Sequence, residues 1–121
     1  MDLSRATEAH TAWKVKLRVA IGNRDKLDAV KISADNCCEL GQWLHGAARS
    51  EVGSRPELET LLTTHATFHR EAGRVAERIN ARDFPAARAM LEKGSTFVQA
   101  SHHVASAIGA LRRVLRTAAA A

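Results

Sequence analysis

Four side chains that commonly bind transition metals lie far apart in this chain, most of them beside apolar or aromatic residues at helix-turn spacing. They are His10, Cys38, His65 and His69. Histidines at positions i and i+4 of a helix, as His65 and His69 would be, place both imidazoles on one face, one turn apart. That spacing suits binding of one Zn²⁺ by both rings, and a thiolate and a third imidazole from other helices would complete a tetrahedron. The pattern predicts a closed zinc site inside a helical bundle.

The same residues also have an interpretation without metal. A single histidine on an apolar helix face is usually a core residue bonded to a neighbour, and a buried cysteine usually behaves as a small hydrophobic side chain. Burying two imidazoles one turn apart is costly unless each finds a partner, which weighs against coincidence. Reasoning from these residues alone leaves the two interpretations about equally supported.

If a metal binds, the ligand types favour zinc and argue against catalysis. Thiolate with imidazole suits Zn²⁺, whereas non-haem iron would require carboxylates and a di-iron bundle would require paired Glu-x-x-His motifs. A catalytic zinc keeps one coordination position open for water or substrate, and one cysteine with three histidines leaves none. We therefore expect a metal-binding protein that is not an enzyme.

Composition and apolar periodicity predict a single all-helical domain over residues 1–121. The chain contains only two prolines, five aromatic residues and few β-branched runs, and its length is sufficient for its own core. Helices are expected over residues 3–21, 36–45, 56–80 and 85–117. Residues 24–34 are left irregular, 47–55 are expected to form a loop, and 118–121 to form a frayed tail. The expected architecture is an antiparallel four-helix bundle with an additional short helix that carries the cysteine ligand.

Capping residues predict where these helices begin and end. Ser4 is expected to cap the first helix and Gly22 to help end it. Asp35 is expected to cap the short helix, which places Cys38 in its first turn, where the helix dipole favours the thiolate. Gly46 would end that helix, and Pro56 would occupy the first position of the next.

The last helix is expected to be the longest. Its apolar residues follow a heptad spacing from Met90 to Leu115, which predicts a continuous seam with one face left for a second copy of the chain.

Charge and hydropathy exclude several classes of partner. The net charge of +5 is spread along the chain, without the basic stripe and interleaved aromatics of a nucleic-acid interface. No apolar run is long enough to insert into a membrane, and residues 1–10 do not resemble a signal peptide. Cys37 and Cys38 are adjacent, which makes a disulfide between them strained. We expect a cytoplasmic protein with reduced thiols.

Three segments together resemble the chemoreceptor zinc-binding (CZB) domain family. They are His10-x-x-Trp13-Lys14-x-x-Leu17, Cys38-Glu39-Leu40-Gly41-Gln42-Trp43-Leu44 and His65-x-x-Phe68-His69, and the resemblance covers about residues 8–75. It implies a helical bundle that binds Zn²⁺ through His10, Cys38, His65 and His69. Around this site we expect packing by Trp13, Gly41, Trp43 and Phe68.

The resemblance also implies a role in bacterial signalling. The family occurs with chemoreceptors and diguanylate cyclases, so we expect a sensory domain that acts on such a module in cis or in trans, as a homodimer. Two alternatives are a dimerisation module with a structural zinc and a redox or hypochlorite sensor that works through Cys38. Metal affinity would separate the first alternative from a zinc sensor, and the oxidation rate of the zinc-bound thiol would identify the second.

Overall fold

The computed structural model describes residues 1–120, and Ala121 lies outside this range. Over these residues the chain forms helices and no strand, which confirms the all-helical prediction. The helices are α1 (Leu3–Thr11), α2 (Trp13–Asn23), α3 (Ala29–Ser33), α4 (Glu39–His45), α5 (Ala48–Val52), α6 (Pro56–Asn80), α7 (Phe84–Ala89) and α8 (Thr96–Ala120).

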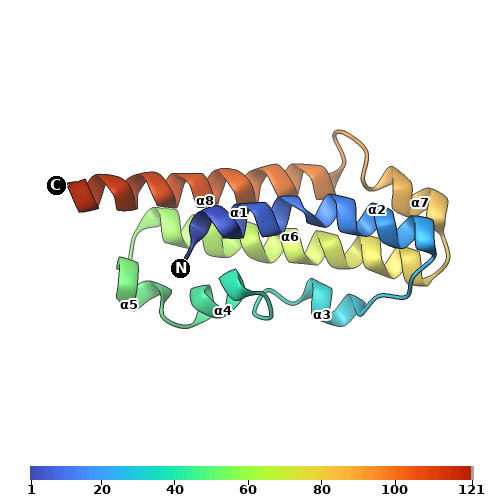
Figure 1. Ribbon diagram of the computed structural model, residues 1–121, viewed down its shortest axis with the longest axis horizontal. Helices are drawn as coiled ribbons and strands as arrows, with labels where there is room; N and C mark the ends of the chain where they lie inside the picture. Colours follow the sequence, from blue (N-terminus) through green and yellow to red (C-terminus); the bar gives the residue numbers. More distant parts are fainter. Residues whose placement is uncertain (121) are drawn as a thin grey trace.

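The chain passes four times along the long axis of the molecule (Figure 1). Helices α1 and α2 run one way, the short helices α3, α4 and α5 return, α6 runs forward again, and α8 comes back. Helix α6 packs most extensively on α8 and α3, and α1 packs on α8. No helix within residues 1–120 is long and apolar enough to cross a membrane.

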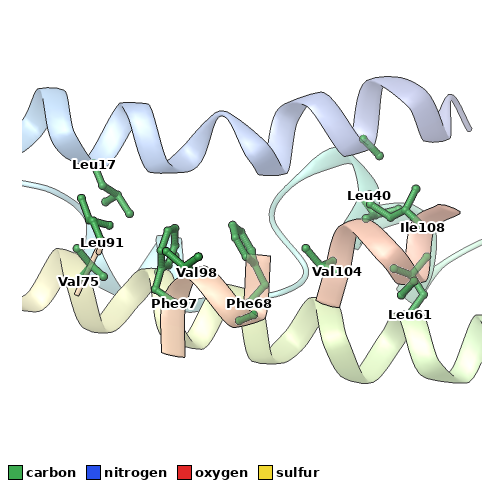
Figure 2. Close-up of a cluster of buried hydrophobic side chains, with 14 of the residues drawn as sticks. Leu17, Leu40, Leu61, Phe68, Val75, Leu91, Phe97, Val98, Val104 and Ile108 are labelled. Atoms are coloured by element: carbon green, nitrogen blue, oxygen red, sulfur yellow. The ribbon is translucent and has the colours of Figure 1, made fainter. Parts of the chain in front are cut away.

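A continuous apolar core lies between these passes (Figure 2). Its largest members come from α6 and α8 and include Phe68, Phe97 and Ile108, each with at most 1% of its surface exposed. The apolar side chains of α6 recur every three or four residues, so one side of this 25-residue helix is buried along its length. Pro56 opens α6 as predicted, because a residue without an N–H loses nothing at the first helical position.

The predicted first helix over residues 3–21 is two helices that meet at Ala12. Near the junction, the Thr11 hydroxyl donates to the Glu8 carbonyl, which also accepts the Ala12 N–H. Such competition by a side chain bends helices. The capping predictions were wrong here: Asp2, not Ser4, caps α1, and the left-handed residue after α2 is Arg24, with φ of 55°.

The predicted last helix over residues 85–117 was also wrong, because α7 and α8 are separated by residues 90–95. Gly94 in this connection has φ of 85°, a conformation that interrupts a helix and that glycine adopts without strain. The heptad seam therefore does not continue through Met90 and Gly94. Helix α8 is long, as predicted, but its length of 25 residues equals that of α6. It includes residues 118–120, and the last residue of the predicted tail lies outside the described range.

Two segments that the sequence left without helix contain short ones, α3 within 24–34 and α5 within 47–55. Helix α3 is fastened to α6 by side chains that the local sequence does not reveal. The Asn80 amide accepts the Leu27 N–H and donates to the Leu27 carbonyl, both at 2.8 Å. Closer to the middle of α6, Gly73 faces Ser33 so closely that a Cβ on Gly73 would lie 2.5 Å from the Ser33 Cβ.

We predict that Gly73→Ala destabilises the fold by about 1–3 kcal/mol, because an added methyl group would push α3 away from α6. Gly22→Ala in the exposed part of α2 is the matched control, since nothing lies within 4 Å of the added atom. It should stabilise by roughly 0.5–1 kcal/mol through the loss of backbone freedom in the unfolded chain. Urea unfolding midpoints measure both changes, and equal effects of the two substitutions would contradict the close α3–α6 contact.

Candidate metal centre

The four predicted metal-binding side chains come from three separate parts of the fold. His10 lies near the end of α1, His65 and His69 lie on one face of α6, and Cys38 is the residue that caps α4. One donor atom from each lies within 4.8 Å of all the others. The Cys38 Sγ is 3.7, 3.3 and 3.5 Å from the Nε2 atoms of His10, His65 and His69. The structure therefore brings together residues separated by up to 59 positions in the chain.

Backbone carbonyls fix the orientation of two of the imidazoles. His10 Nδ1 lies 2.7 Å from the Ala6 carbonyl oxygen, and His69 Nδ1 lies 2.9 Å from that of Ile32. A carbonyl oxygen only accepts, so each Nδ1 must carry the proton and donate it. In the neutral rings this leaves the Nε2 lone pairs directed at Cys38, which is the tautomer that a metal requires.

Cys38 lies one residue before α4 rather than in its first turn, which corrects the predicted capping by Asp35. Its Sγ takes the place of a capping oxygen and accepts the Gly41 N–H at 3.3 Å. Gly41 is itself required, because a Cβ there would collide with the Asp35 carbonyl. The turn that precedes α4 is thus folded tightly enough to direct the sulfur toward the histidines.

Burial sets the protonation of the centre. His10, His65 and His69 have at most 3% of their surface exposed. Desolvation lowers the pKa of all three imidazoles, and with the neighbouring histidines it takes the pKa of His65 to about 3. Burial raises the pKa of the Cys38 thiol more than the Gly41 N–H lowers it, so the dipole effect expected from the sequence is outweighed. At neutral pH the site holds three neutral imidazoles and one thiol.

The donor set fits a tetrahedral zinc ion. Zinc bonds to nitrogen and sulfur of ordinary length, arranged tetrahedrally, place each nitrogen about 3.6 Å from the sulfur. The three observed separations, 3.3 to 3.7 Å, bracket that value. His65 gives a second indication, because its Nδ1 is the buried side-chain polar atom without a partner among the described residues. A buried imidazole that lacks this bond is costly unless its other nitrogen gains a strong one, as in binding a cation.

Of the four residues expected around the site, Phe68 contacts two of the imidazoles and Trp13 lines a cavity beside the centre. The Phe68 ring meets His10 and His69 edge-on, with centroids 5.3 and 5.4 Å away, and contacts Phe97 on its other side. Trp13 lines a cavity together with Cys38 and His69.

The Trp43 indole N–H donates to the Glu51 carboxylate and so ties α4 to α5. The remaining imidazoles and thiol are not in the cluster. His45 pairs with Asp35 at 3.1 Å, and His102, His103 and Cys37 are exposed.

Contacts that the sequence did not reveal hold this centre in place. The Ala6 carbonyl could have been anticipated, since it lies one turn before His10, but the Ile32 carbonyl comes from a segment predicted to be irregular. Arg5 of α1 makes a bidentate ion pair with Glu39, the residue after Cys38, at 2.6 and 2.7 Å. It joins the two elements that supply His10 and Cys38.

Comparison with known proteins identifies the family. Residues 10–76 match the family model described as the chemoreceptor zinc-binding domain. The match includes all four donor residues and more than half of the chain, so the chain belongs to this family, and Zn²⁺ is its cofactor. No curated protein and no solved structure gives a significant match.

Because only the thiol must lose a proton, we predict that zinc binding releases one proton per site at neutral pH. The apparent affinity should then rise about tenfold per pH unit between about pH 6.5 and 8, and more steeply in acid, where imidazoles begin to hold protons. Calorimetric zinc titrations in buffers with different ionisation enthalpies measure the proton count. Release of two or more protons near pH 7.5 would contradict the lowered imidazole pKa values.

Proposed function

We propose that this member of the chemoreceptor zinc-binding domain family is a zinc-responsive sensory domain, with His10, Cys38, His65 and His69 as its metal ligands. The observation that carries the proposal is the convergence of one sulfur and three Nε2 atoms from α1, the start of α4, and α6. Bound zinc would supply four bonds that hold these elements together. Since all four positions are taken by protein atoms, the site is suited to sensing or structure rather than to catalysis.

Metal occupancy would matter most for α4. This helix makes its main contacts with α5 and α1 rather than with α6, which carries two of the histidines. Zinc coordination in small domains contributes about 10–16 kcal/mol, which is comparable to the whole stability of a domain this size. Loss of the ion would therefore leave the Cys38 segment with few contacts to α6, and the positions of α4 and α1 would change with zinc concentration.

The output of this change would pass through α1 to α8. Helix α1 packs along α8, so a shift of His10 would change the contacts between α1 and α8. We propose that the chain folds as one domain in which the short helices complete a four-helix bundle, that it acts as a homodimer, and that it controls a chemoreceptor or diguanylate cyclase module in cis or in trans.

Two further roles are compatible with the same centre. A structural zinc in a dimerisation module would show an affinity far tighter than the free zinc concentration of the cell, whereas a sensor's affinity should lie near it. A redox or hypochlorite sensor would use Cys38, the one ligand that is only half-buried. Such a sensor requires the zinc-bound Cys38 thiolate to react with oxidant faster than a free thiol.

We predict that Cys38→Ser and His65→Ala each lower zinc content below one ion per chain, because three protein ligands remain where four are needed. Elemental mass spectrometry of the purified variants measures the stoichiometry. Cys37→Ser and His102→Ala are matched controls that remove the same kinds of group from exposed positions, and both should keep one zinc per chain. Full zinc content in the Cys38 and His65 variants would overturn the ligand assignment.

We also predict that chelation of zinc increases amide hydrogen exchange in α1 and in residues 35–46 more than in the middle of α8. Helix α1 carries one of the ligands near its end and residues 35–46 have few contacts to α6, whereas the centre of α8 is held by apolar packing against α6. Mass spectrometry of exchange with and without zinc tests this. A uniform increase along the chain would mean global destabilisation and would favour a structural zinc.

A further inference from the structure

The three buried imidazoles of the metal centre are oriented in different ways. His10 Nδ1 bonds the Ala6 carbonyl one turn earlier in its own helix, so formation of α1 is enough to fix that ring. His65 Nδ1 has no partner among the described residues. His69 Nδ1 bonds the Ile32 carbonyl, 2.9 Å away, which belongs to α3. The orientation of His69 therefore depends on where α3 lies on α6.

Helix α3 does not hold that position by itself. It has five residues, none of them buried, and an isolated helix of that length is not stable in water. The helix lies along α6 (Figure 1). Besides the Ile32 bond, this segment is held by Asn80, which bonds Leu27, and by Gly73, which touches Ser33. The contact at Gly73 is van der Waals packing, whereas Asn80 makes two directional bonds.

Asn80 bonds both backbone groups of Leu27. A planar amide places an acceptor and a donor side by side, and here its oxygen accepts the Leu27 N–H while its NH₂ group donates to the Leu27 carbonyl, each at 2.8 Å. Both bonds are partly buried, where a hydrogen bond is stronger than in water. Leu27 directly precedes Asp28, the residue that caps α3. The two bonds therefore fix the start of the helix that carries the Ile32 carbonyl.

We propose that Asn80 is a positioning residue for the metal centre, which acts through α3 on His69, eleven residues away in the chain. By fixing Leu27, Asn80 keeps the Ile32 carbonyl on His69 Nδ1, so the proton stays on that nitrogen and the Nε2 lone pair stays directed at Cys38. Without that carbonyl, a neutral imidazole carries its proton on either nitrogen, and a ring protonated at Nε2 cannot bind a metal through that atom. The assignment rests on the proposed function only in that His69 is taken as a zinc ligand.

The position of the His69 proton in the metal-free protein tests this role. Side-chain ¹⁵N NMR at about pH 8, where imidazoles are neutral, distinguishes a protonated ring nitrogen from an unprotonated one. We expect His69 to carry its proton on Nδ1 in wild-type protein and to shift toward a mixture of both tautomers in Asn80→Ala. His10 should keep its Nδ1 proton in both proteins, because its partner Ala6 lies in the same helix. A residue that served stability alone would leave the His69 tautomer unchanged.

Zinc affinity gives a second readout. We expect Asn80→Ala to keep one zinc per chain but to bind it about tenfold more weakly, since loss of the partner of a ligating histidine costs roughly 10–100-fold in metal affinity. Asp83→Ala is the matched control at the same end of α6, because the Asp83 carboxylate caps α7 by accepting the Ala86 N–H. Loss of this cap should lower stability but leave the His69 tautomer and the zinc affinity unchanged.

Asn80→Asp keeps the acceptor for the Leu27 N–H and loses only the donor, so it should change His69 in the same direction, and it takes the place of Asn80→Ala if that variant does not fold. An unchanged His69 tautomer and zinc affinity in a folded Asn80 variant would overturn the positioning role. Equal changes at His10 and His69 would overturn it as well, because they would reflect a general loosening of the fold. The proposed function fails on a different result, full zinc content in Cys38→Ser and His65→Ala, and the tautomer measurement requires no metal.

Discussion

The structure depends on one costly arrangement, three imidazoles and a thiol buried against one another. Polar groups removed from water must be bonded elsewhere, and here the backbone satisfies two rings while a third keeps an unpartnered nitrogen. The bonds that satisfy the rings also point their remaining lone pairs at the sulfur. The site is thus preorganised by the fold, and a cation would be bound by groups that already lie at zinc-like separations.

Helix α6 links this arrangement to the apolar core. It carries His65 and His69 toward Cys38, and Phe68 between them reaches both the imidazoles and Phe97 of α8. The same helix receives α3 at Gly73, and that contact brings the Ile32 carbonyl to His69. Packing and metal binding are therefore not independent, because the residues that fix ring orientation also hold the passes of the chain together.

The centre is asymmetric in a way that suits a reversible ligand. Its histidines belong to α1 and α6, which contribute to the core, whereas its cysteine precedes a short helix with few contacts to α6. The histidines are neutral because they are buried, and the thiol is the group that must lose a proton. In the proposed function, proton release and movement of the chain would therefore be concentrated at Cys38 and its neighbours.

The sequence by itself determined the helical class, the start of α6 at Pro56, the family, and the four side chains that cluster at the candidate metal centre, because these depend on local periodicity and on residue types at fixed spacing. It did not determine the break at Ala12, the separation of α7 from α8, or the short helices α3 and α5. The heptad spacing of the sequence continues through Gly94, and only packing decides whether the chain turns there. Tertiary structure alone also decided that Cys38 caps α4, that burial outweighs the helix dipole in its pKa, and that Ile32 orients His69. Each of these depends on which distant segment packs beside a residue, and the local sequence does not specify that segment.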